Sequence, residues 1–147
     1  MPGRRNRRRR GSVIVEFALA FPLLFAFLGG MFQFGYAFHI YNQIQSAIRN
    51  AGRYAATADF DGEAGGAAFR TGVRNMAVFG NPAGGTVPVA AGLATGNIAV
   101  AWQADGAGIP QVVSVTLNDF TLNGIWGSFV ITGRPRSTFI YLGQFVS

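Results

Sequence analysis

Residues 17–38 read FALAFPLLFAFLGGMFQFGYAF, and this run is almost entirely apolar. Gln33 is its only clearly polar side chain. As a helix rising 1.5 Å per residue, the run would be about 33 Å long, enough to cross a membrane hydrocarbon core of roughly 30 Å. The run therefore predicts a transmembrane helix.

Basic residues are concentrated just before this run. The full sequence has 12 basic and 6 acidic residues, which gives a net charge of +6. Positive charge accumulates on the cytoplasmic side of a membrane helix, so the N-terminus is expected inside and everything after Ile40 outside. Because charges balance in the rest of the chain, no nucleic-acid-binding surface is expected on the fold. The block before Gly11 consists of arginines: Arg4, Arg5, Arg7, Arg8, Arg9 and Arg10.

The helical periodicity continues beyond the apolar run. One helix is therefore expected from Ser12 to about Ala58, transmembrane in its first half and amphipathic in its second. Pro22 lies inside it and can kink it, because proline removes one backbone hydrogen bond. Apolar residues recur at three- and four-residue spacing in the second half, with polar residues between them: Ile40, Ile44, Ala47, Ile48, Ala51 and Ala55.

The remainder of the chain predicts a second helix and a small sheet, so the expected fold class is α+β. Residues 63–79 have a helical period that ends at Gly80-Asn81-Pro82. Alternating apolar residues predict strands that form an antiparallel meander with one face on the long helix, near 98–102, 113–117, 129–132 and 137–146. The expected organisation is a basic leader, the transmembrane part of the helix and an extracytoplasmic domain, at residues 1–11, 12–41 and 42–147.

Glu16 stands at the junction of leader and apolar run, and it is the only acidic residue among the first 58. A charged side chain inside a bilayer is costly and needs a partner. If the chain were cut between Gly11 and Ser12, the new amine would lie about 6 Å along the helix from Glu16. Pairing with the amine of a neighbouring copy would make Glu16 a device that sets the register of assembly. Alternatively, Glu16 simply favours the dipole of a first helical turn.

These residues bear a family resemblance. An arginine-rich leader, Gly11, Ser12 and then Glu16 and Phe17 directly before an apolar helix resembles the class III signal of type IV pilins. The run VEFALAFPLLFAFLGGMFQFGYAFHIYNQIQSAIRNAGRYAA, at residues 15–56, is similar to the TadE family of minor pseudopilins from tight-adherence (Flp) pilus systems.

The resemblance implies a pilin-like fold and a role in pilus biogenesis or adhesion. A prepilin peptidase would cut after Gly11, Ser12 would become the N-terminus, and Glu16 would act in subunit assembly. Partners would be other pilins or pseudopilins and the inner-membrane assembly platform. The chain would cross the bacterial cytoplasmic membrane once, with its domain in the periplasm or on the cell surface. Phe17 replaces the tyrosine of the major pilins, and the external part is much larger, which favours a minor, accessory subunit.

Several other residues invite a functional interpretation. Ala26 and Gly30 form a small-xxx-small pair, which lets helices approach closely. His39 is interpreted as an anchor at the membrane interface, together with Tyr36 and Tyr41. Asp59, Asp61 and Glu63 alternate and offer oxygen ligands for Ca²⁺, but capping of the second helix is the simpler interpretation.

The residue inventory argues against catalysis. The chain has no cysteine and one histidine, and no phosphate-binding loop or catalytic triad can be recognised. No enzymatic activity, cofactor, metal or small-molecule substrate is expected. One alternative to a pilus subunit remains open, an external binding module unrelated to pili. It would be either unprocessed or released by signal peptidase at the small-x-small site Gly35-Tyr36-Ala37.

Overall fold

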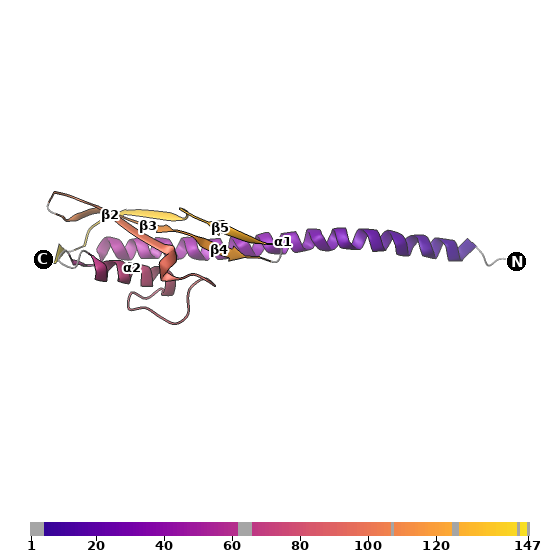
Figure 1. Cartoon of the computed structure of the whole chain (residues 1–147), viewed down its shortest axis with the longest axis horizontal. Coiled ribbons are helices and arrows are strands. Elements are labelled where there is room, and N and C mark those ends of the chain that lie inside the picture. The colour runs from indigo at the N-terminus through magenta and orange to yellow at the C-terminus, as the bar shows by residue number, and fades with distance from the viewer. Residues whose placement is uncertain (1–4, 62–65, 107, 125–126, 144, 147) are drawn as a thin grey trace. The chain divides into compact units, whose positions relative to one another are not determined.

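The computed structural model describes residues 5–61, 66–106, 108–124, 127–143 and 145–146, without the side chains of 5–11, 61 and 145–146 (Figure 1). Contacts divide the chain into two compact units, Met1–Tyr36 and Ala37–Ser147. The first unit is helical wherever it is described. The second contains the end of the same helix, a second helix and the strands.

Helix α1 spans Arg5–Thr57 and continues through Pro22. The predicted single helix is therefore confirmed, but it begins at Arg5 and not at Ser12. Arginine is a good helix former, so the leader can extend the helix that the apolar run begins. Within the described residues, this is the one helix long and apolar enough to cross a membrane, with a mean hydropathy of 2.2 in its apolar window.

Helix α2 spans Ala67–Phe79 and is bounded by two glycines. Gly66 has φ 68° and Gly80 has φ 69°, a left-handed conformation that a side chain disfavours and that stops a helix. The Gly80 N–H donates to the Met76 carbonyl at 3.0 Å. The predicted end of this helix is confirmed, whereas its start lies beyond the predicted Glu63, which is outside the described residues.

The strands form three small sheets. β2, β3 and β6 make an antiparallel sheet in the order β2-β3-β6, β4 and β5 pair antiparallel, and β1 and β7 pair parallel. The α+β fold class, with a long helix, a shorter helix and small antiparallel sheets, is confirmed. A 3₁₀ turn, η1 at Thr95–Asn97, precedes the longer strands. The bounds are β1 Phe60–Asp61, β2 Ile98–Ala104, β3 Pro110–Leu117, β4 Phe120–Asn123, β5 Ser128–Ile131, β6 Arg136–Ile140 and β7 Phe145–Val146.

The predicted meander is wrong in its strand order. The third predicted strand, now β5, pairs with β4, which the sequence reading missed, and β6 pairs with β3. The β4-β5 hairpin thus continues the β3-β6 pair, because Gly133 N–H donates to the Leu117 carbonyl at 2.8 Å across the break between them. Asp119 with φ 49° and Gly133 with φ 76° mark this break. The predicted strand at 137–146 ends at Ile140.

The core of the second unit lies between α1, α2 and the strands, which are gathered around the second half of α1 in Figure 1. The predicted apolar stripe of α1 faces this core: every member is at most 6% exposed. An amphipathic helix therefore supplies one wall of the domain, as its period predicts. The opposing side chains come from α2 and the sheets, and include Phe69, Val73, Val78, Ile98, Val113, Val115, Leu117, Phe120 and Leu122.

Gly52 on α1 allows β6 to approach the helix closely. A Cβ atom at this position would lie 2.6 Å from Cε2 of Phe139 and 3.2 Å from the Ser137 hydroxyl oxygen. Both distances are shorter than ordinary van der Waals contact. The packing of β6 on α1 therefore requires glycine, which has no side chain, at position 52.

Replacing Gly52 with Val is expected to destabilise the second unit by about 1–3 kcal/mol, since extra carbons in a packed core force side chains and backbone apart. The melting temperature of the detergent-solubilised chain, followed by circular dichroism, measures this effect. Gly96→Val is the control, because a Cβ there meets no atom within 4 Å. Equal melting temperatures for the two variants would contradict the prediction.

Tyr141 connects the end of the sheet to the end of α1. Its Oη donates a hydrogen bond to the Ala58 carbonyl at 2.8 Å, and its side chain is 8% exposed. Burial, and then the negative charge of Asp59, raise the pKa of Tyr141 above its ordinary value of 10.0. The folded state therefore holds the phenol neutral where the unfolded chain would ionise it.

This pKa shift predicts a loss of stability in alkali. Because the folded pKa is raised, the stabilisation is complete below the unfolded pKa and is lost as the pH rises through the folded pKa. Tyr141→Phe should lower stability near pH 7 by about 1 kcal/mol, through the lost hydrogen bond, and should show a smaller further loss at about pH 11 than the parent. Urea midpoints at both pH values measure this. An equal alkaline loss in parent and variant would exclude Tyr141 as its source.

Candidate functional site

The predicted processing and assembly residues all lie in α1. The backbone of Gly11 is helical, and Ser12 and Glu16 are exposed. Ser12 and Glu16 are four residues apart in a continuous helix, so they share one face at a separation of about 6 Å along the axis. Arg7, Arg8, Arg9 and Arg10 are helical in their backbone, and their side chains lie outside the described residues.

Phe17 begins an aromatic stripe beside Glu16. Its ring lies 5.6 Å from that of Phe21, which lies 6.2 Å from that of Phe25. Phe17 is 65% exposed. Spacing of four residues places these rings on one helix face, where they can contact lipid or another helix.

The small residues Ala26 and Gly30 lie one turn apart on α1. Ala26 is exposed and Gly30 partly buried, and a Cβ at Gly30 would meet no atom within 4 Å. A side chain added at Gly30 would therefore meet no other described atom of this chain, and the contact of this surface with a second helix stays a prediction.

The large apolar side chains of the first unit are exposed along its length. Their exposure ranges from 46% at Leu28 to 77% at Leu23. Soluble proteins rarely expose a contiguous apolar surface of this kind, whereas lipid or packed partner helices would cover it. The arrangement suggests a membrane anchor.

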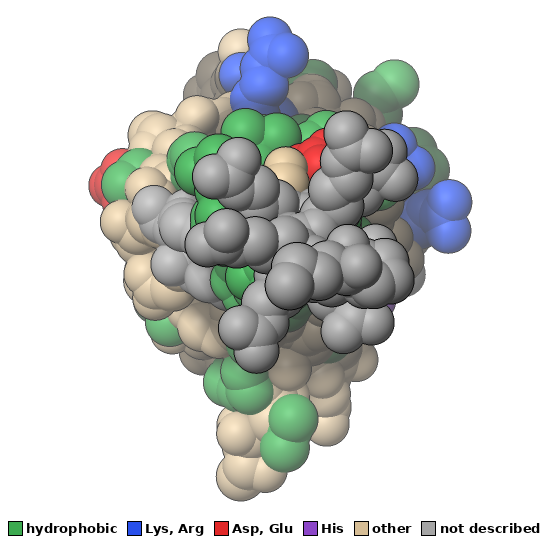
Figure 2. All heavy atoms as spheres, turned by 90° about the vertical axis from the view of Figure 1, so that its right-hand side faces the viewer, with side chains coloured by type: hydrophobic (Ala, Val, Ile, Leu, Met, Phe, Trp, Pro, Cys, Tyr) green, Lys and Arg blue, Asp and Glu red, His purple; other side chains and the backbone are tan. Residues whose placement is uncertain are grey.

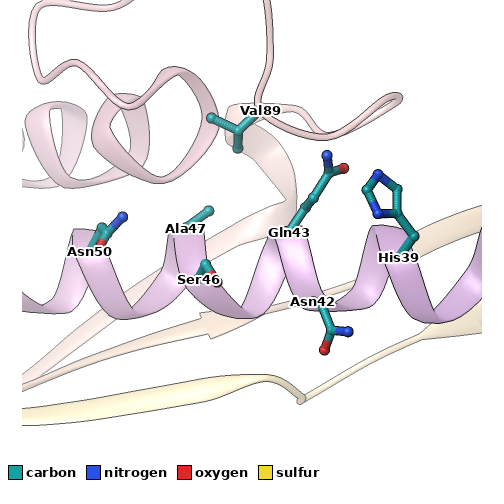
Figure 3. A pocket seen from close by; sticks show the side chains of 7 residues that line it. All are labelled: His39, Asn42, Gln43, Ser46, Ala47, Asn50 and Val89. Carbon is teal, nitrogen blue, oxygen red and sulfur yellow. The ribbon is translucent and has the colours of Figure 1, made fainter.

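A polar groove of about 390 Å³ runs along α1 inside the second unit, on the side where Val89 approaches the helix. In Figure 3, Gln43 and Ala47 point toward Val89, His39 lies one turn away, and Asn42 points in another direction. His39 is exposed, as an interfacial residue would be. Ser46 and Asn50 complete the lining of the groove. The sequence reading placed these polar residues between core positions without predicting a groove.

A second cleft, of about 580 Å³, joins α1 to the start of β6. Arg134 and Arg136 line it together with Tyr41 and Gln45. The sequence reading missed this cleft, because no local pattern connects a loop before β6 to the first turns of the domain's helix.

The possible Ca²⁺ ligands receive no support from the described residues. Asp59 is exposed, while the side chain of Asp61 and the whole of Glu63 lie outside the described part. Among the residues that the structure does describe, no group of three or more His, Asp or Glu side chains could hold a metal ion. The prediction that these acids cap the second helix is wrong, because the N-cap residue of α2 is Gly66 and no acidic residue lies in the first turn of this helix.

Comparison with known proteins finds a match for the N-terminal part of the chain. No curated protein and no solved structure matches the chain. Residues 11–53 match the family of TadE-like proteins, so the match begins at Gly11 and ends one turn before the end of α1. Over residues 11–53, the resemblance of this chain to the TadE-like proteins is confirmed.

Proposed function

We propose that this chain is a minor pseudopilin that assists the assembly of a Tad (Flp) pilus. The family match suggests a Tad pilus-associated protein, and the observation that carries the finer proposal is that the match begins at Gly11. Gly11 is also the glycine after which a class III signal would be cut. Processing there would leave Ser12 as the first residue, directly ahead of Glu16 and the exposed apolar helix.

The proposed mechanism is packing of helices in and above the membrane. The exposed apolar half of α1 inserts among other pilin or pseudopilin helices, with Phe17 and the open surface at Ala26 and Gly30 in contact. Glu16 pairs with the terminal amine of a neighbour, which aligns the subunits. The second unit remains outside the membrane and contacts the assembly platform. The role is structural, and no reaction is assigned to the chain.

Cleavage after Gly11 requires local unwinding, since Gly11 and Ser12 both lie within the helix. Glycine lowers helix stability by about 1 kcal/mol relative to alanine, so the helix opens more easily at this bond than at its neighbours. A peptidase that binds an extended segment would therefore find its substrate most accessible at Gly11.

The mature N-terminus tests the proposal. Mass spectrometry of the chain extracted from host membranes should show a first residue of Ser12, with or without a methyl group. An intact Met1, or a start at Phe38 after signal-peptidase cleavage, would overturn it.

Two matched glycine substitutions identify the enzyme responsible. Gly11→Leu should block processing, whereas Gly35→Leu, which disrupts the alternative small-x-small site, should leave the Ser12 terminus unchanged. A Cβ at Gly35 would meet no atom within 4 Å, so this control is sterically tolerated. Loss of processing in the Gly35 variant alone would instead favour the secreted binding module.

A further inference from the structure

The arginine cleft of the second unit has a lining suited to an anion. Arg134 and Arg136 are exposed, and they line the cleft together with Tyr41 and Gln45 of α1. Arginine guanidinium groups bind phosphate oxygens through paired N–H donors, and a phenol or a carboxamide can donate to the remaining oxygens. The chemistry of this lining therefore matches a phosphate group.

The two arginines have no acidic partner in the described part of the chain, where neither forms an ion pair. Other arginines of this unit have defined contacts. Arg74 donates from Nε to the Ile98 carbonyl at 3.1 Å, and Arg70 lies over the Trp102 ring at 4.6 Å. Blue arginine side chains stand out at the surface in Figure 2. Arg134 and Arg136 are thus available to an external anion.

The position of the cleft along α1 indicates which kind of anion would bind there. Phe139 of β6 lies at Gly52, and the cleft residues before it in β6 lie at Gln45 and Tyr41. Moving backward along β6 therefore moves backward along α1, toward the residue where this unit begins, Ala37. The cleft therefore lies beside the residues of α1 with which the second unit begins.

Tyr41 is only three residues, or about 4.5 Å of helix, beyond Phe38, the last residue of the apolar run. Phe38 is 66% exposed. Tyrosines at this distance from a membrane span typically lie at the level of the lipid headgroups. A cleft lined by Tyr41 would therefore meet phospholipid phosphates before any soluble anion.

The hairpin that continues from the cleft also carries exposed apolar side chains. Phe129 is 52% exposed and Val130 is 66% exposed, both in β5, which precedes Arg134 in the chain. Cations beside exposed apolar groups are the combination that binds an anionic membrane surface.

We propose that Arg134 and Arg136, together with Tyr41 and Gln45, bind the phosphate of an anionic phospholipid in the leaflet facing the second unit. This binding would hold the domain against the membrane surface. The inference rests on the membrane anchoring of α1 given under the proposed function, but not on processing at Gly11 or on entry into a pilus.

Titration of the detergent-solubilised full chain with phosphatidylglycerol, followed by native mass spectrometry, tests the site. Near an anionic surface each arginine strengthens binding roughly fivefold, so Arg134→Gln with Arg136→Gln should weaken binding of one lipid by roughly 25-fold. Arg49→Gln with Arg53→Gln is the matched control, since it removes two exposed charges from α1 outside the cleft. The arginine leader is the same in all three proteins, so its own lipid binding cancels.

Three results would overturn the proposal. These are equal phosphatidylglycerol affinity in the two double variants, equal affinity of the parent for phosphatidylcholine, and displacement of the lipid by equimolar inorganic phosphate. Circular dichroism melting of both double variants confirms that each is folded.

Alkaline carbonate washing of the host membranes distinguishes a failure of the lipid-site proposal from a failure of the proposed function. Release of the chain by the wash would contradict membrane anchoring. A chain that resists the wash but lacks arginine-dependent lipid binding would contradict the lipid site alone.

Discussion

Glu16→Ala is expected to leave the chain in the membrane and to reduce its incorporation into a pilus assembly by about tenfold or more. The acid lies on an exposed face of α1, one turn from Ser12, where it can meet the amine of a neighbouring subunit. Removing the carboxylate leaves the apolar helix, and hence insertion, intact. The variant should therefore insert into the membrane normally but assemble poorly.

Co-purification of the chain with pilus components, and counts of surface pili, measure this effect. Glu16→Gln should behave like Glu16→Ala, because the amide preserves size but not charge. Val15→Ala is the control, since Val15 is a neighbouring exposed residue at 60% exposure without a charge. Normal piliation by the Glu16→Ala strain would rule out the register mechanism and leave the helix-dipole interpretation of this acid.

Ile44→Ala is expected to cause the largest loss of stability in the second unit. Ile44 is 0% exposed and lies in the core formed by α1, α2 and the sheets. Truncation of a buried isoleucine leaves a cavity and costs roughly 2–5 kcal/mol. Because α1 carries both this core residue and the apolar run, the variant should still enter the membrane while its external domain unfolds more readily.

Ile140→Ala is a matched control, because it makes the same chemical change at a position that is 70% exposed. Surface substitutions usually change stability by less than about 0.5 kcal/mol. Thermal denaturation of both variants in detergent, and their sensitivity to an added protease, provide the comparison. If the two variants melt at the same temperature, α1 does not form the wall of the core that the structure shows.

The two grooves along the second half of α1 extend the proposed function in different ways. The groove at His39, Gln43 and Val89 has no arginine in its lining, whereas Arg134 and Arg136 line the arginine cleft. A helix that only had to hold a domain would need its apolar stripe and little else. The flanks of that stripe are the surfaces that we propose for lipid and for partner subunits.

The strand prediction shows where local patterns stop being informative. Alternation located β2 and the inner residues of β3, because a half-buried strand repeats every two residues. The pattern missed β4, which has only four residues and follows the break at Asp119. It also placed β5 beside β6, since neighbouring strands in a chain commonly pair. In the structure both strands of the β3-β6 pair are interrupted, at Asp119 and Gly133, and the β4-β5 hairpin continues beyond this break.

From the amino-acid pattern alone we could predict the long helix, its apolar first half, its core-facing side and the junction at Gly11 and Glu16. Each of these depends on interactions between residues within one or two helical turns, or on the transfer of one segment from water to lipid. The strand order could not be predicted in this way, and neither could the cleft that Arg134 and Arg136 form with α1. Such contacts join residues far apart in the chain, and their geometry follows from how the sheet packs on the helix. Gly52 contributes to this packing, because its lack of a side chain leaves room for β6.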